Sequence, residues 1–172
     1  MIGGAVLAGC AVFSYPGRDY VLVGLMLFLP LADRRWVLPI PPRDTRHIVI
    51  WGCLVLAGAG MLLWQPQHAG FALATLLLAA LPEEWFFRAY FMVRLGTGWR
   101  ANLIASLLFA VMHGFSRDWT AAALVFLPSL FYGWLYQRTR DLPLLILAHG
   151  LSNLLYVLFV AKLAVMYPLD LR

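Results

Sequence analysis

Charged residues are scarce in this chain of 172 residues, and their scarcity excludes a water-soluble protein. Only 12% of the residues are charged and 63% are hydrophobic, whereas roughly 25% of the residues of a soluble domain carry charge. A small soluble protein leaves much of its surface in water and could not hide so many apolar side chains. The composition therefore predicts an all-α fold, a polytopic bundle of about seven transmembrane helices.

Cysteine is also scarce, and basic residues do not cluster as they do in nucleic-acid-binding proteins. The two cysteines, Cys10 and Cys53, both lie in apolar surroundings, which argues against a disulfide framework or a reactive thiolate. The net charge of +5 is better explained by membrane topology than by a nucleic-acid partner. With almost no polar sequence to spare, residues 1–172 are expected to form a single integral-membrane domain.

Seven apolar segments account for most of the chain. The expected ranges are 2–15, 20–32, 47–64, 69–93, 101–115, 120–136 and 142–166. The first two have roughly 14 residues each, fewer than the roughly 20 of a comfortable span. They are therefore expected to form either two short spans or a shallow hairpin.

The arginines predict the orientation. Twelve of the thirteen basic residues are arginine, and the loops 33–46, 94–100 and 137–141 hold four, two and two of them. The intervening short loops hold only Arg18 and Arg117. The positive-inside rule places the arginine-rich set in the cytoplasm, so seven spans would put the N-terminus in the cytoplasm. The membrane is expected to be the bacterial inner membrane.

Glutamate occurs only twice in the chain, at the adjacent positions Glu83 and Glu84, inside the apolar run 71–93. A carboxylate at mid-bilayer depth costs about 3 kcal/mol on insertion scales. A chain that keeps two, with Arg88 one helical turn further on, is expected to use them. The alternative is a purely structural charge pair buried in the bundle.

The spacing around the glutamates suggests a division of labour. Glu84 and Arg88 are four residues apart, share a helix face and are expected to pair. Glu83 is turned about 100° away, has no partner on its own helix and is interpreted as a general base. Pro82 removes a backbone donor just before them, and the kink it predicts either widens the bundle at this depth or is an ordinary membrane-helix kink.

Two histidines and an asparagine inside other apolar segments are the further candidates, namely His113, His149 and Asn153. At about 1.5 Å of rise per residue, they and the glutamates fall within about 9 Å of one another along the membrane normal. Phe109 lies one turn before His113 and is expected to form an apolar wall. The alternative for each histidine is a packed side chain bonded to a backbone carbonyl.

Taken together, these residues form three spaced motifs, each on its own apolar segment: Glu-Glu-x-x-x-Arg, then Phe-x-x-x-His, then His-x-x-x-Asn. The chain resembles the CPBP family of intramembrane proteases, which includes the Rce1-type CAAX prenyl endopeptidases and the bacterial Abi-type proteins. The motifs lie within residues 83–153 and match all seven signature positions of that family, whereas residues 1–70 match nothing recognisable. The seven positions are Glu83, Glu84, Arg88, Phe109, His113, His149 and Asn153.

The resemblance implies hydrolysis of a peptide bond inside the membrane. By matching position, Glu83 and His113 would activate the attacking water. His149 and Asn153 would stabilise the oxyanion of the tetrahedral intermediate, which is commonly a large part of catalysis. The catalytic core is expected to be residues 71–160.

The remaining positions would have supporting roles. Glu84 and Arg88 would hold the first motif in place, and Phe109 would contact the substrate. The implied partners are the lipid bilayer and a membrane-embedded or lipidated protein or peptide. Such a substrate could be a prenylated CAAX-type tail, a bacteriocin or pheromone precursor, or a C-terminal sorting signal.

Two alternatives remain open, one about a metal cofactor and one about the class of function. Family members have been described both as metalloproteases and as glutamate-type proteases. Zinc could be held by Glu83, His113 and His149, but these lie on separate segments and no His-Glu-x-x-His is present, so a metal-free site is favoured. The alternative functions are a non-catalytic immunity or scaffold protein and, third, a proton or ion carrier.

Overall fold

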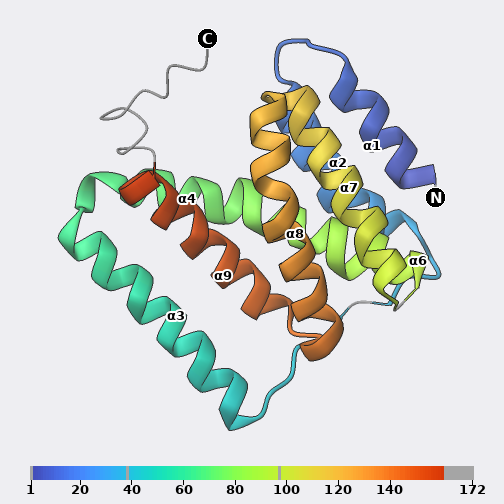
Figure 1. The fold of residues 1–172 in the computed structure, drawn as a ribbon. Coiled ribbons are helices and arrows are strands. Elements are labelled where there is room, and N and C mark those ends of the chain that lie inside the picture. The colour runs from blue at the N-terminus through green and yellow to red at the C-terminus, as the bar shows by residue number, and fades with distance from the viewer. Residues whose placement is uncertain (1, 38, 97, 161–172) are drawn as a thin grey trace.

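The computed structural model describes residues 2–37, 39–96 and 98–160, and over these residues every regular element is a helix (Figure 1). Short 3₁₀ (η1) and π-helical (η2, η3, η4) segments interrupt or extend the α-helices. The elements in chain order are α1 (Ile2–Val12), α2 (Arg18–Ala32), α3 (Thr45–Trp64), η1 (Pro66–His68), α4 (Ala69–Thr75), η2 (Leu76–Ala80), α5 (Leu81–Glu84), η3 (Trp85–Met92), α6 (Val93–Leu95), α7 (Trp99–Ser116), α8 (Trp119–Thr139), α9 (Leu142–Leu155) and η4 (Tyr156–Val160).

Each of the seven expected apolar segments contains a helix, so the predicted all-α fold is confirmed, although the first helix ends at Val12 and not at residue 15. The segments from η1 to α6 form one continuous stretch. Four stretches are long and apolar enough to cross a membrane: Thr45–Trp64, Pro66–Leu95, Trp119–Thr139 and Leu142–Val160. The chain is therefore an integral membrane protein with four candidate spans. The helices α1, α2 and α7 do not meet the combined requirement of length and apolar character. The expected end of the last segment, 161–166, lies outside the described residues.

Polar contacts gather the three arginine-rich loops at one end of the bundle. An ion pair and two hydrogen bonds make these links. Arg94 Nε lies 3.2 Å from Asp33 Oδ2, Gln137 Nε2 donates to Gly98 O at 3.0 Å, and Trp51 Nε1 donates to Asp141 Oδ2 at 2.9 Å. The ends of α2 and α6 and the beginnings of α3, α7 and α9 therefore meet, as the alternating arginine content of the loops predicts.

A single arginine joins helices at the opposite end. Arg18, the first residue of α2, donates to the backbone oxygens of Phe115 at 3.3 Å and Ser116 at 2.7 Å. These carbonyls belong to the last turn of α7, where intrahelical donors run out, and a cation there also complements the helix dipole. Arg18 therefore caps α7 and holds the α1–α2 connection against the α7–α8 connection.

The helix that carries the two glutamates widens on both sides of them. Pro82 has no N–H, and its ring would clash with the carbonyl four residues earlier in an α-helix. The π-helical segment η2 ends immediately before α5, and there the N–H of Leu81 bonds to Leu76 O, five residues back. A second π-helical segment, η3, follows at once. The kink expected from Pro82 thus takes the form of two widened segments, a feature that is frequent at functional sites.

Helices α7 and α8 approach closely because a glycine faces a polar side chain. A Cβ atom at Gly133 would collide with the side chain of Asn102. Asn102 is buried; its Nδ2 donates to Leu130 O at 2.9 Å and its Oδ1 accepts from Ser106 Oγ at 3.2 Å. A small residue facing an interhelical hydrogen bond is a common way to join membrane helices.

This contact generates the first prediction. Gly133→Ala should lower the free energy of unfolding by about 1–3 kcal/mol, because the added methyl group displaces the bonded Asn102 side chain. Gly60→Ala on α3, where nothing lies within 4 Å of the added Cβ, should leave stability unchanged or raise it by about 0.5–1 kcal/mol. Tryptophan fluorescence during detergent-denaturation titrations measures both, and equal midpoints for the two variants would contradict the packing described.

Candidate active site

A buried ion pair lies at the base of the site. Glu84 on α5 is fully buried and Arg88 on η3 is 2% exposed. Glu84 Oε2 lies 3.2 Å from Arg88 Nε, at an angle that gives an ion pair without a hydrogen bond. Arg88 Nη2 also donates to the hydroxyl and backbone oxygens of Ser129 on α8, at 2.9 and 3.2 Å. The pairing expected from the four-residue spacing is therefore present.

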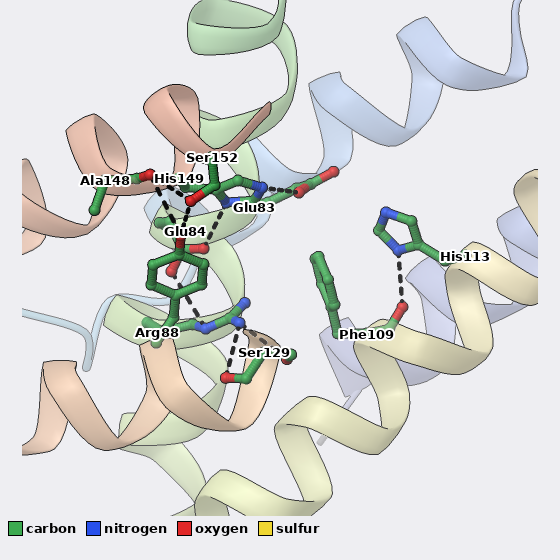
Figure 2. Close-up of polar contacts among 10 residues, drawn as sticks. Glu83, Glu84, Arg88, Phe109, His113, Ser129, Ala148, His149 and Ser152 are labelled. Carbon is green, nitrogen blue, oxygen red and sulfur yellow. Dashed lines mark hydrogen bonds and ion pairs between the residues drawn. The ribbon is translucent and has the colours of Figure 1, made fainter. Parts of the chain in front are cut away.

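The other oxygen of Glu84 holds a histidine from a different helix. Glu84 Oε1 lies 2.8 Å from Nδ1 of His149 on α9. A carboxylate oxygen only accepts, so Nδ1 is the nitrogen that donates. The opposite nitrogen, Nε2, consequently faces Glu83, whose Oε2 lies 3.7 Å away. Figure 2 shows the His149 ring between the two glutamates. Sequence spacing predicted no such link.

Two residues outside the motifs also fix the histidine. The ring of Tyr132 on α8 stacks on the ring of His149, with centroids 5.4 Å apart and planes 15° from parallel. The Tyr132 hydroxyl lies 2.7 Å from Ser152 Oγ and donates to Ala148 O at 3.3 Å. Sequence reasoning missed Ser129, Tyr132 and Ser152. The available signal was the three-residue spacing of Ser129 and Tyr132, which places both on one face of an apolar helix.

His113 on α7 approaches Glu83 from the other side. His113 Nδ1 donates to the backbone oxygen of Phe109 at 3.0 Å, so in the neutral imidazole Nε2 is the nitrogen that carries the lone pair. Figure 2 shows the Glu83 carboxylate extending toward the His113 ring. The Phe109 ring lies 4.4 Å from that ring, and its centroid is 4.9 Å from the Arg88 guanidinium carbon. The apolar wall expected of Phe109 is therefore present.

A cavity of about 280 Å³ brings the predicted residues together. Its lining includes side chains from η2–η3, α7, α8 and α9. All the predicted site residues line it except Glu84, which lies behind them, fully buried. Those lining it are Glu83, Arg88, Phe109, His113, His149 and Asn153. Depth estimates along separate helices could not give this lateral proximity, which the packing of the helices supplies.

Whether the site could hold a metal ion depends on how its His and Glu side chains are grouped. In the part of the chain that is described, no group of three or more His, Cys, Asp and Glu side chains lies close enough to hold one. The potential ligands Glu83, His113 and His149 line the same cavity without forming such a group.

Comparison with known proteins agrees with the geometry. The family model for the type II CAAX prenyl endopeptidase Rce1-like proteins matches residues 64–155, more than half of the chain. The chain belongs to this family. No curated protein and no solved structure matches the chain significantly. The matched range of the Rce1-like family extends from the last residue of α3 to the end of α9 and contains all three motifs.

Membership of the Rce1-like family supports a general activity. The family implies a CAAX-type intramembrane endopeptidase whose substrate is a membrane-associated protein. The resemblance inferred from the three motifs is therefore confirmed at the level of the family. The helices α1 and α2 lie outside the matched range.

The buried ion pair generates the second prediction. Arg88→Met should cost about 3–5 kcal/mol of stability, because it leaves the buried Glu84 carboxylate without its cation. Adding Glu84→Gln should recover part of that loss. Arg94→Met, which breaks a half-exposed pair with Asp33, should cost less than about 1 kcal/mol. Denaturation midpoints in detergent measure all three variants, and a double variant no more stable than Arg88→Met would contradict the coupling.

Proposed function

We propose that this protein is a glutamate-type intramembrane endopeptidase, in which Glu83 and His113 activate a water molecule to hydrolyse a peptide bond. The observation that carries the proposal is the position of Glu83. Its carboxylate lies between two histidines from different helices and lines the cavity that both of them line. A carboxylate in that position can exchange a proton with water and with the leaving amine.

The first half of the reaction uses Glu83 and His113. A water molecule in the cavity donates one proton to Glu83, and His113 Nε2 accepts a hydrogen bond from the same water. The resulting hydroxide attacks the peptide carbonyl carbon, and the π electrons move onto the oxygen. Protonated Glu83 then gives its proton to the leaving nitrogen as the C–N bond breaks, so that the products are a carboxylic acid and an amine.

The oxyanion formed between these two steps needs donors. His149, when it carries a proton on Nε2, and the Asn153 amide line the cavity one helical turn apart on α9. Donors fixed before the reaction stabilise developing charge without reorganising, which is why they accelerate acyl transfer. Glu84 bonds to the His149 ring and Tyr132 stacks on it, while Arg88 holds Glu84 through the ion pair. Their proposed role is to hold this donor in place.

The orientation and extent of the domain are also part of the proposal. We place the arginine-rich loops 33–46, 94–100 and 137–141 in the cytoplasm, on the basis of the positive-inside rule. Seven spans then give a cytoplasmic N-terminus in a bacterial inner membrane. Residues 1–172 form one domain, and its catalytic core is residues 71–160.

The volume of the cavity that Glu83 and both histidines line is too small for a long peptide, so most of a peptide substrate would lie outside it. A space of about 280 Å³ is just below the usual range for ligand sites, roughly 300–1,000 Å³. It suits a short extended stretch around one peptide bond. We propose a membrane-associated substrate that presents such a stretch, either a prenylated CAAX-type tail, a bacteriocin or pheromone precursor, or a C-terminal sorting signal.

The third prediction tests the catalytic roles. Glu83→Gln and His113→Ala should each lower the cleavage rate by about 10²–10⁴-fold, the typical contribution of a positioned acid or base, while the protein still inserts and folds. His68→Ala changes a histidine of η1 that does not line the cavity, so it should leave the rate unchanged. A quenched fluorescent farnesylated CAAX peptide in liposomes reports the rate. Cleavage unchanged by Glu83→Gln would refute the catalytic assignment.

The fourth prediction identifies the natural substrate. Cells that express the Glu83→Ala variant should accumulate one uncleaved membrane precursor, because the site still binds it without activating water. Quantitative proteomics of membranes from variant and unmodified cells measures the accumulation. If Glu83→Ala cells retain the full cellular phenotype with no precursor, the non-catalytic binding alternative is correct.

Cleavage by the purified enzyme after removal of metal ions tests the metal-free mechanism. A zinc chelator should leave the cleavage rate unchanged, because the proposed steps use only side chains of this chain. Loss of activity on chelation, restored by added zinc, would favour the metalloprotease alternative.

A further inference from the structure

A second cavity lies on the other side of Glu83 and His113. Its volume is about 140 Å³, and one wall consists of Leu22, Val23 and Met26 of α2. The opposite wall includes Met112 of α7. Glu83 and His113 line this cavity as well as the larger one. The two side chains proposed to activate water therefore lie on the shared boundary of the cavities, together with Ala79, Phe109 and Arg117.

The second cavity has polar groups at both of its ends. At the outer end its lining includes Asp19, whose side chain is 80% exposed, together with Ser116 and Arg117. Arg18, which caps α7, fixes this rim by holding the end of that helix against α2. At the inner end are Glu83 and His113. The rim is thus a charged opening at the end of the bundle.

Its size and chemistry suit water. A site needs roughly 10–15 Å³ of accessible volume and two to four polar partners to hold one water molecule. A volume of about 140 Å³ therefore has room for several, in a file from the charged rim to the two catalytic side chains. A wholly apolar cavity would stay dry, but this one has hydrogen-bonding groups at each end.

Hydrolysis consumes one water molecule in each turnover. A peptide bound in the 280 Å³ cavity fills the space on its side of Glu83, so water must arrive from elsewhere. We propose that the cavity between α2 and α7 is the route by which water reaches Glu83 and His113. This inference rests on the proposed function, and it gives α2, which lies outside the family match, a part in the reaction.

The proposed orientation adds a consequence. The rim lies at the α1–α2 and α7–α8 connections, at the opposite end of the bundle from the arginine-rich loops. Water would therefore enter from the face opposite the cytoplasm.

The first test measures whether the cavity is hydrated and needs no substrate. The native cysteines are first removed by Cys10→Ser and Cys53→Ser, and then either Met112→Cys or Val111→Cys is introduced. Each variant is treated with silver ions in detergent micelles, and a maleimide dye counts the thiols that have not reacted. Met112 lines the cavity, whereas its neighbour Val111 is 39% exposed on the outer face of α7. Only a hydrated thiol ionises readily, so Met112→Cys should react at least about tenfold faster. Equal rates would overturn the inference.

The second test asks whether this route supplies Glu83. The larger cavity is first filled with the farnesylated CAAX peptide, which Glu83→Cys cannot cleave. Glu83→Cys is then reacted with silver ions alone, in combination with Val23→Trp, and in combination with Val21→Trp as the matched control, since Val21 lies on the exposed face of α2. The indole of Val23→Trp fills the cavity, and the reaction should slow by about tenfold, while Val21→Trp should change nothing. An unchanged rate with Val23→Trp means that water comes through the larger cavity and the inference is wrong.

These tests separate the two proposals. Silver reactivity depends on hydration alone, so its outcome is independent of whether the farnesylated peptide is cleaved. If Glu83 is not the catalytic base, the Glu83→Gln variant will still cleave the peptide. If the water route is wrong, the silver reaction rates will not differ as expected, while Glu83→Gln will still lower the cleavage rate. Denaturation midpoints of the two tryptophan variants, expected to agree, identify a variant that has failed to fold.

Discussion

The site depends on one fully buried carboxylate. Glu84 is surrounded by side chains, and it binds Arg88 through one oxygen and His149 through the other. An uncompensated carboxylate at this depth would be very costly, so the helices that carry its partners have little freedom to separate. Through Arg88 the constraint reaches Ser129 on α8, and through His149 it reaches α9. A single anion thereby sets the spacing of three helices around the cavity.

The sequence predicted the helices and the polar positions because both depend on local patterns. The thickness of the bilayer sets the length of an apolar segment, and the four-residue helical spacing brings Glu84 and Arg88 together. It did not predict the Glu84–His149 bond, which joins residues 65 positions apart and depends on how α9 rotates against α5. Nor did it single out Ser129 and Tyr132. Their three-residue spacing places both on one helix face, but a serine and a tyrosine in an apolar helix can satisfy their hydrogen bonds in many ways, so the spacing alone does not mark them as site residues.

The two glutamates also differ in a way that their adjacency hides. Glu84 faces inward to the ion pair, whereas Glu83 faces the cavities and His113. The general-base interpretation of Glu83 came from the absence of a partner on its own helix. The structure adds His149 Nε2 at 3.7 Å, so the proposed base and the proposed oxyanion donor are neighbours. The two halves of the proposed reaction therefore use groups that lie side by side in the cavity.

The π-helical segments on either side of the glutamates have a mechanical consequence. Each segment bonds five residues back, so it contains more residues per turn than the α-helix it interrupts. Such a turn shifts the rotational phase of everything beyond it. The outer part of the helix, α4, packs against α9, while η3 packs against α7 and α8. With a phase shift at each border, the short turn Leu81–Glu84 presents its two carboxylates at an angle that an uninterrupted α-helix would not give them.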